Sequence, residues 1–169
     1  MIFLGLGSNM GEKVQNIISA LDHLSAAGVH TLRRSRLFVT PPWGVENQDS
    51  FLNIVAEVYY DGNAEDLLQI LLNTEQTMGR YRYYKWGPRL IDIDILEFHR
   101  EVHNTESLKL PHPYYPQRTF VLVPFADLEP DWVPTGETDT IAEILKSLPS
   151  DGIFPLDHSG YQPVFQKEL

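Results

Sequence analysis

An alternation of isoleucine and aspartate over residues 91–95 constrains the fold of this chain more than any other feature of its sequence. In a β-strand alternate side chains share a face, so the three isoleucines of this segment can point together into a core. The two aspartates between them, Asp92 and Asp94, then lie on the opposite face with their Cα atoms about 6.6 Å apart. We therefore expect a strand over residues 90–98 that buries one face and carries two neighbouring carboxylates on the other.

The other apolar patterns predict two helices and three more strands before residue 90, of which the first is short. Apolar residues repeat with helical spacing over 14–24 and 63–78, while runs rich in β-branched and aromatic residues predict strands. The expected strands before residue 90 are Ile2–Leu6, Val29–Thr40 and Phe51–Tyr60. The resulting order, strand–helix–strand–strand–helix–strand, predicts an α+β fold: a ferredoxin-like split βαβ sandwich with a mostly antiparallel sheet and helices packed on one face of it.

The boundaries and the second half of the chain give weaker signals. Ser8 or Asn9 is the expected N-cap of the first helix, since both side chains can accept a hydrogen bond from the first helical turn. After residue 98 we expect Pro-rich turns, a short strand over Phe120–Val123 that follows Arg118, and a weak helix over Ile141–Leu148.

Composition limits the classes of protein to which the chain can belong. Its 169 residues fit one domain, 1–169, with an acidic C-terminal extension over 131–169. The absence of cysteine excludes disulfide scaffolds, Cys-zinc sites and thiol catalysis. A net charge of −10 disfavours binding to nucleic acid or to an anionic membrane. No apolar run suits a signal peptide or a membrane span, so we expect a cytoplasmic protein, monomeric rather than oligomeric.

A basic cluster interrupts this acidic background directly before the predicted strand at 90–98. Residues 80–89 hold four cations and no acidic residue, namely Arg80, Arg82, Lys85 and Arg89. Like charges this close repel one another unless an anion joins them, and arginine binds phosphate through paired hydrogen bonds. Trp86 and three tyrosines of the same segment offer flat faces to an aromatic ligand. We expect a phosphate-binding loop that can close as a lid; the alternative is a surface for single-stranded nucleic acid.

The aspartate pair is typical of a metal site when it lies beside such a loop. Mg²⁺ takes one or two protein carboxylates and completes its octahedron with phosphate and water. For Asp92 and Asp94 taken alone, the alternative is two solvated acids on an outer strand face. A Mg²⁺-dependent phosphohydrolase or nuclease would use the same pair, so the pair does not by itself decide the reaction.

Other residues suit an aromatic substrate and its phosphate donor. Phe51 and Asn53 share a face of their strand, where the ring can stack on a heterocycle while the amide reads its polar edge. Taken alone, the two are also typical of a core ring and a strand-edge hydrogen-bonding group. His112 stands between two prolines and is followed by Arg118 and Phe120. His112 and Arg118 can donate to phosphate, although a lone histidine is also commonly structural.

Together these residues resemble the 6-hydroxymethyl-7,8-dihydropterin pyrophosphokinase family over about residues 1–130. The most specific motif is Trp86-Gly87-Pro88-Arg89-Leu90-Ile91-Asp92-Ile93-Asp94. The others are Leu4-Gly5-Leu6-Gly7-Ser8-Asn9, Thr40-Pro41-Pro42-Trp43-Gly44, Phe51-Leu52-Asn53, Gly79-Arg80 with Arg82, and Pro111-His112 with Arg118 and Phe120. The family is ferredoxin-like and Mg²⁺-dependent, and it transfers the terminal pyrophosphate of ATP to the pterin hydroxymethyl group with release of AMP. The resemblance thus implies an ATP-dependent diphosphotransferase of folate biosynthesis.

The resemblance also implies a role for each matching residue. Asp92 and Asp94 would hold two Mg²⁺ ions that bridge the ATP phosphates, and Arg82 and Arg89 would join them in catalysis. The implied pterin site comprises Thr40, Pro41, Pro42, Trp43, Gly44, Phe51, Asn53 and Phe120. The implied nucleotide site comprises Arg80, Lys85, Trp86, Arg89, His112 and Arg118. The expected partners are ATP and the pterin, without nucleic acid or membrane.

Overall fold

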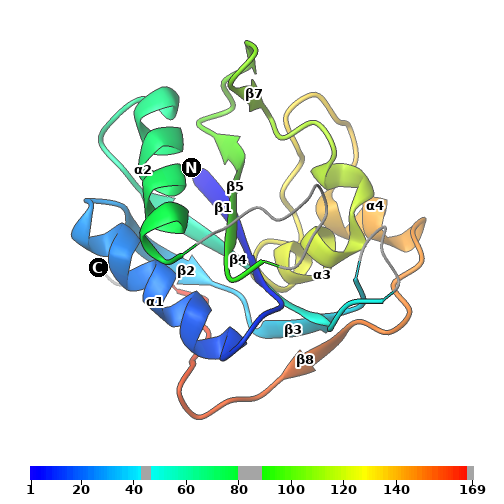
Figure 1. Cartoon of the computed structure of the whole chain (residues 1–169). Coiled ribbons are helices and arrows are strands. Elements are labelled where there is room, and N and C mark those ends of the chain that lie inside the picture. Colours follow the sequence, from blue (N-terminus) through cyan, green and yellow to red (C-terminus); the bar gives the residue numbers. More distant parts are fainter. Residues whose placement is uncertain (43–46, 80–88, 167–169) are drawn as a thin grey trace.

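The computed structural model describes residues 1–42, 47–79 and 89–166 of the chain. The strands of its main sheet are β1 (Ile2–Ser8), β2 (His30–Arg34), β3 (Leu37–Thr40), β4 (Phe51–Tyr59), β5 (Asp92–Phe98) and β8 (Phe154–Leu156). Within the described ranges they are ordered β5-β1-β4-β3-β8, with β2 also paired to β4 (Figure 1). Every pair is antiparallel, which confirms the predicted sheet.

Two helices, α1 (Lys13–Ala26) and α2 (Ala64–Thr77), cover one face of this sheet (Figure 1). Buried residues of both helices, such as Ile17 and Leu67, join one core cluster with Leu4 of β1 and Ile54 of β4. The order of strands and helices from β1 to β5 is that of the ferredoxin-like split βαβ fold, as the sequence predicts.

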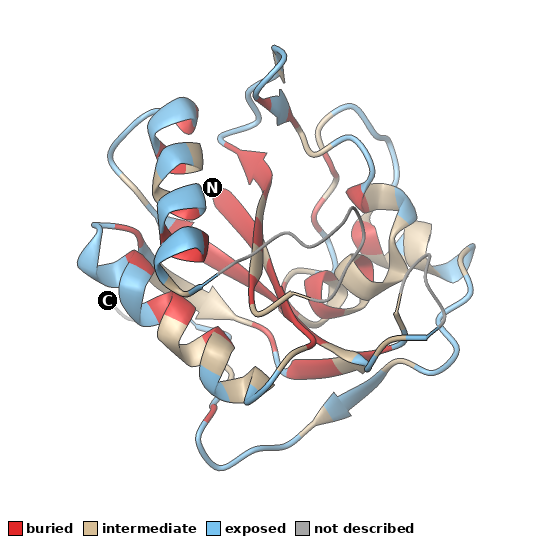
Figure 2. Cartoon of the chain, in the orientation of Figure 1, coloured by how far each residue is buried: buried red, intermediate tan, exposed pale blue. Residues whose placement is uncertain are grey.

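The opposite face carries a second layer of helices. This layer consists of α3 (Thr119–Leu128), α4 (Ile141–Lys146) and the 3-10 turn η1 (Tyr115–Gln117). Phe125 of α3 packs there in a second cluster with Phe3, Val55 and Leu96 of the sheet. The expectation that helices lie on one face only is therefore wrong. Strands β1, β4 and β5 bury side chains on both faces, so both faces need a cover (Figure 2).

The predicted strand over Phe120–Val123 is wrong, because these residues belong to α3. Its apolar residues run almost without interruption up to Pro124, a pattern that does not separate a strand from a buried helix. In the structure Leu122, Phe125 and Leu128 repeat every three residues and are buried together. Packing of this stripe against the sheet outweighs the cost of a proline inside the helix.

The predicted strand Val29–Thr40 is divided into β2 and β3. The interruption lies at Ser35, which is completely buried. Its hydroxyl donates to the carbonyl of Arg36 at 2.9 Å and accepts from the backbone N–H of Val55 at 3.1 Å. The Ser35 N–H still donates to the Val55 carbonyl at 2.9 Å, so the serine hydroxyl replaces only the Ser35 carbonyl as the acceptor for the Val55 N–H.

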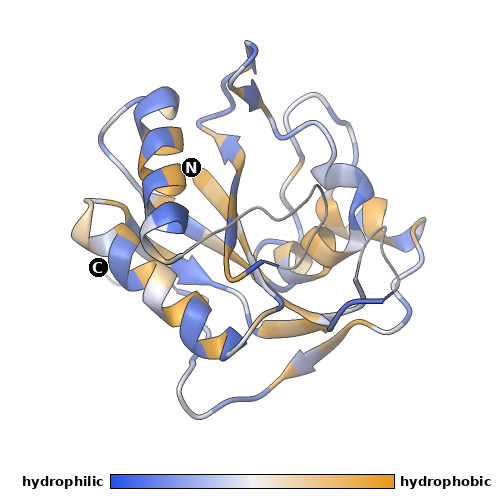
Figure 3. Cartoon of the chain, in the orientation of Figure 1, coloured by the Kyte–Doolittle hydropathy of each residue, from blue (hydrophilic) through white to orange (hydrophobic). Residues whose placement is uncertain are grey.

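The alternation over residues 91–95 is confirmed. The three isoleucines are buried in the first cluster, whereas Asp92 and Asp94 are only partly buried and face the other side. In Figure 3 hydrophobic residues follow the sheet between the helical layers.

Beyond β5 a small hairpin of β6 (His103–Asn104) and β7 (Lys109–Leu110) precedes η1. Within the described residues no helix has the length and apolar character that crossing a bilayer requires.

We predict that Phe125→Ala destabilises the protein through the second cluster. The ring is fully buried and lies 4.7 Å from that of Phe3, centroid to centroid, so its removal leaves a cavity. The free energy of unfolding in urea should fall by about 3–5 kcal/mol. Phe154→Ala is the matched control, because that ring is 53% exposed, and it should change the free energy by less than about 0.5 kcal/mol. Equal effects of the two substitutions would contradict the assignment of α3 to the core.

Candidate active site

The described residues cover only part of the second face of the sheet, and the part they leave uncovered forms a cleft. At one end Phe3 and Leu96 lie beneath α3. At the other end the same face of β1 carries Gly5 and Gly7, which have no side chains to fill the space above the strand. A cleft of about 820 Å³, its open mouth included, lies over these glycines.

The strand register places polar side chains on both sides of the glycines. Gly7 pairs with Asp92 of β5 and with Asn53 of β4, and Gly5 pairs with Asp94 of β5. A Cβ atom on Gly7 would come within 2.5 Å of the Asn53 Oδ1 atom. A glycine is therefore required here, because any side chain would displace the asparagine that borders the cleft.

The β4 side of the cleft is aromatic with one buried amide. The Asn53 Nδ2 atom donates to Thr40 Oγ1 at 2.7 Å, and both residues are buried. Phe51, two residues before Asn53, lines the cleft together with Pro41 and with Phe120 of α3. The structure thus brings together the described residues that the sequence assigns to the pterin, apart from Pro42, which does not line the cleft.

The β5 side of the cleft concentrates negative charge. The Asp94 carboxyl has its pKa raised to about 7, first by removal from solvent and then by the charges of Asp92 and Glu75. Glu75 of α2 is buried and accepts a hydrogen bond from the backbone N–H of Ile93 at 2.7 Å. Asp92 is paired with Arg89. Asp92 and Asp94 line the cleft, whereas Glu75 does not, and the negative charge of all three favours a cation beside the aspartate pair.

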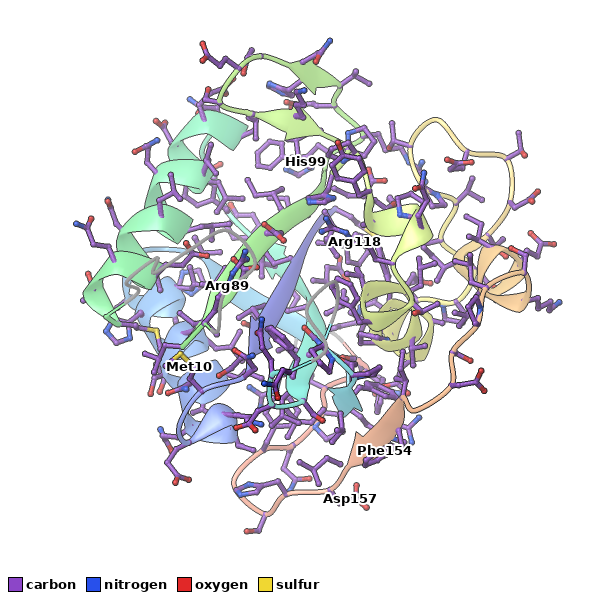
Figure 4. The ribbon with its side chains drawn as sticks, turned by 45° about the vertical axis from the view of Figure 1, so that its right-hand side comes forward. Met10, Arg89, His99, Arg118, Phe154 and Asp157 are labelled. Carbon is purple, nitrogen blue, oxygen red and sulfur yellow. The ribbon has the colours of Figure 1, made fainter. Side chains whose placement is uncertain are left out.

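Two arginines border the same carboxylates. Arg89 approaches from the segment before β5, and Arg118 approaches from the residue before α3 (Figure 4). Both lower the pKa of Asp94, although less than burial and the neighbouring acids raise it. The structure therefore combines anionic groups for a cation with cationic groups for an anion in one cleft.

The aspartate pair suits Mg²⁺, which takes only part of its ligands from the protein, better than it suits a metal ion that protein side chains coordinate completely. Within the described ranges no group of three or more His, Cys, Asp or Glu side chains could jointly hold a metal ion. Asp92 and Asp94 nevertheless offer two neighbouring carboxylates on one face, and their mutual repulsion is relieved by a divalent cation. Mg²⁺ commonly binds through one or two carboxylates and takes its other ligands from phosphate and water.

His112 lies beside the cleft as a neutral ring. Burial, followed by the charge of Arg118, lowers its pKa to about 4. The Nδ1 atom accepts from the backbone N–H of Tyr114 at 3.2 Å, so the ring proton resides on Nε2. His112 therefore offers a neutral N–H donor rather than a cation, and it does not itself line the cleft.

Several predicted site residues lie outside the described residues. They are Trp43 and Gly44 of the segment before β4, and Arg80, Arg82, Lys85 and Trp86 of the basic segment. Their roles therefore stay predictions from the sequence. The described residues that border the proposed site come from β1, β3, β4, β5 and α3, and from Pro41, Arg89 and Arg118 next to these elements.

Asn9 is a positioning residue for which the sequence suggested only a helix-capping role. That expectation is wrong, because the N-cap of α1 is Glu12. Instead the Asn9 Oδ1 atom accepts from the backbone N–H of Arg89 at 2.7 Å, and the Asn9 N–H donates to the Arg89 carbonyl at 3.1 Å. Its Nδ2 atom donates to Gln48 at 3.1 Å. A buried asparagine directly after β1 was the available signal, but local spacing cannot show a partner 80 residues away.

Comparison with known proteins agrees with this site. The profile of the 7,8-dihydro-6-hydroxymethylpterin-pyrophosphokinase (HPPK) family matches residues 3–130. The chain belongs to the HPPK family. The match runs from β1 to the end of α3 and so includes every strand that borders the cleft.

Individual relatives share this assignment. A 2-amino-4-hydroxy-6-hydroxymethyldihydropteridine pyrophosphokinase of Methylorubrum extorquens is 42% identical over 152 residues, covering 89% of this chain and 95% of the relative. The protein of the same name from Aquifex aeolicus is 38% identical over 130 residues, covering 77% of this chain and 81% of the Aquifex protein. A folic acid synthesis protein of Pneumocystis carinii is 34% identical over 155 residues, which are 92% of this chain but 21% of that protein.

Solved structures agree on the fold. Plasmodium falciparum HPPK-DHPS with pteroate superposes with a TM-score of 0.70 over 86% of this chain, at 16% sequence identity. This chain spans 41% of that longer protein, so the likeness concerns its HPPK-like part alone. At this identity the superposition supports the ferredoxin-like fold and not the role of any residue.

We predict that Asn9→Ala disturbs the segment that carries Arg89. The substitution leaves the Arg89 N–H without its acceptor, so the free energy of unfolding should fall by about 1–3 kcal/mol in urea. Turnover should fall as well, because Arg89 borders the carboxylates. Asn73→Ala is the control, since this asparagine is exposed on α2, and its free energy of unfolding should stay within about 0.5 kcal/mol. An Asn9→Ala protein with normal stability and turnover would contradict the positioning role.

Proposed function

We propose that this chain transfers the terminal pyrophosphate of ATP to the hydroxymethyl group of 6-hydroxymethyl-7,8-dihydropterin and releases AMP. Membership of the HPPK family supports this activity. The structural observation that carries it is one cleft that joins an aromatic subsite to two carboxylates and two arginines. We also propose the site residues below; a cytoplasmic location, a monomeric state and the single-domain reading of 131–169 stay predictions from the sequence.

The aromatic end of the cleft suits the pterin. Phe51 and Phe120 line it from different elements, which suits a flat ring placed between them. Asn53 suits the polar edge of that ring, because its amide can both donate and accept and is held by Thr40. The expected backbone contacts of residues 40–44 would complete this subsite.

The charged end of the cleft suits the triphosphate. Arg89 and Arg118 offer N–H donors to phosphate oxygens, and the neutral His112 offers one more from Nε2. Arg80, Arg82, Lys85 and Trp86 are proposed to complete the nucleotide site from outside the described ranges. Asp92 and Asp94 would hold two Mg²⁺ ions, whose chemistry there is to neutralise and polarise the phosphates.

The reaction then needs positioning more than a covalent intermediate. The pterin hydroxyl oxygen forms a bond to the β-phosphorus, while the bond from that phosphorus to the α-phosphate bridging oxygen breaks. AMP leaves with the bridging oxygen, and the hydroxyl proton passes to solvent. Arg89, with Arg82, is proposed to offset the charge that develops on the leaving group.

A Mg²⁺-dependent phosphohydrolase could use the same carboxylate pair, and a direct assay separates the two reactions. AMP should form from ATP only when the pterin and Mg²⁺ are both present, and chelation with EDTA should abolish it. AMP formation without pterin would favour the hydrolase. Binding of single-stranded RNA that weakens with added salt would favour the nucleic-acid alternative.

We predict that Asp94→Asn lowers turnover by two or more orders of magnitude, because it removes one of the two proposed metal carboxylates. The protein should still fold, since the substitution removes a charge that Asp92 and Glu75 disfavour. Circular dichroism and the rate of AMP release would be measured together. Asp61→Asn changes an exposed aspartate in the turn after β4 and serves as the control. Near-normal turnover of Asp94→Asn would refute the proposed role.

A further inference from the structure

Arg118 is held differently from the other arginines that the structure describes. The other five each donate from the guanidinium to a carboxylate or a backbone carbonyl; they are Arg33, Arg34, Arg36, Arg89 and Arg100. Within the described ranges the Arg118 guanidinium has no such partner. Its Cζ atom lies over two aromatic rings, 5.4 Å from the centroid of the Tyr114 ring and 5.8 Å from that of the Phe120 ring.

This arrangement leaves the hydrogen-bonding edges of Arg118 available. A carboxylate partner would occupy the N–H donors and cancel the charge, whereas an aromatic face attracts the cation and leaves its N–H groups in the guanidinium plane. Arg118 lines the cleft beside the carboxylates. The Arg118 guanidinium therefore keeps both its charge and its N–H donors for an anionic ligand.

Of the two rings that contact Arg118, only that of Tyr114 lies outside the lining of the cleft. Phe120 lines the cleft, but Tyr114 does not, and 56% of its surface is exposed. An aromatic residue this exposed gains little from burial, and its ring instead contacts the Arg118 guanidinium. The ring also lies 6.1 Å from that of His112, and the Tyr114 backbone N–H donates to His112 Nδ1. Tyr114 thus contacts both groups that are proposed to donate to phosphate from this side.

We propose that Tyr114 is a positioning residue that holds the Arg118 guanidinium, by contact with its ring, in the orientation that receives the triphosphate of ATP. The proposal rests on the proposed function, because it names the ligand of Arg118. Tyr114 itself does not touch the reacting atoms. Its ring restricts the rotamers of Arg118 before the nucleotide binds, so that less conformational entropy is lost on binding.

The test compares substitutions of Tyr114 that keep or remove the ring. Tyr114→Leu should weaken binding of ATP about two- to five-fold, the range expected for a cation–aromatic contact at an exposed site. Tyr114→Phe keeps the ring and should bind ATP like the wild type. The KM for the pterin should not change, because Phe51, Asn53 and Phe120 remain. A merely structural role would lower stability, or change both KM values, without rescue by phenylalanine.

Tyr59→Leu is the matched control. Tyr59 is 53% exposed and ends β4, eight residues from Phe51, at roughly 26 Å along the strand. Its substitution should leave the KM of both substrates unchanged. If Tyr59→Leu raises the KM for ATP as much as Tyr114→Leu does, the proposal is wrong.

A double-mutant cycle tests whether Tyr114 acts through Arg118. Tyr114→Leu should have no further effect on ATP binding in an Arg118→Ala background, whereas an independent role would give additive losses and overturn the proposal. Binding of ATP without pterin would be measured by titration calorimetry, so that turnover is not required. Wild-type protein that binds ATP but forms no AMP with pterin would contradict the proposed function alone. Unchanged ATP binding by Tyr114→Leu would contradict this inference alone.

Discussion

The concentration of carboxylates at the start of β5 is the constraint to which the rest of the site responds. Asp92 and Asp94 point to the same side because a strand repeats every two residues, and Glu75 adds a third acid through its bond to Ile93. Burial raises the pKa of Asp94 most, and the negative charges of Asp92 and Glu75 raise it further, so these acids disfavour one another's ionised forms. The structure places Arg89 and Arg118 at its border. The electrostatic repulsion between these acids is what a divalent cation in the cleft would relieve.

The helices of the second face serve the core and the cleft at once. Phe125, in the middle of α3, anchors the helix on the sheet, while Phe120 and Arg118 at its start reach the cleft. The glycines of β1 are the complementary feature, because they leave open the part of the face that α3 does not cover. On this face of β1 the large side chain of Phe3 is followed by Gly5 and Gly7, and this change in side-chain size sets the position of the cleft.

The sequence predicted those features that depend on local periodicity. The Ile–Asp alternation predicted the face of each residue in β5, and the spacing of apolar residues predicted α1 and α2. It did not predict α3, whose buried stripe is masked by apolar neighbours and Pro124, nor the role of Asn9. Both depend on distant partners: the second sheet face for α3, and Arg89 for Asn9. The sequence did bring Phe51, Asn53, Asp92, Asp94, Arg118 and Phe120 together as one site, and the structure places them around one cleft.

A protein with a net charge of −10 is an unexpected receptor for a triphosphate, and the arrangement of the cleft resolves this conflict. Long-range attraction for a polyanion is absent at such a charge, so affinity depends on contacts at short range, where screening by salt matters less. Arg89 and Asp92 already satisfy one another, so neither carries an uncompensated charge. A phosphate accompanied by Mg²⁺ can engage both partners at once, whereas a bare polyanion would meet the carboxylates unshielded. Under the proposed function, a cleft that pairs two carboxylates with two arginines would therefore favour a nucleotide accompanied by a metal ion over free nucleic acid.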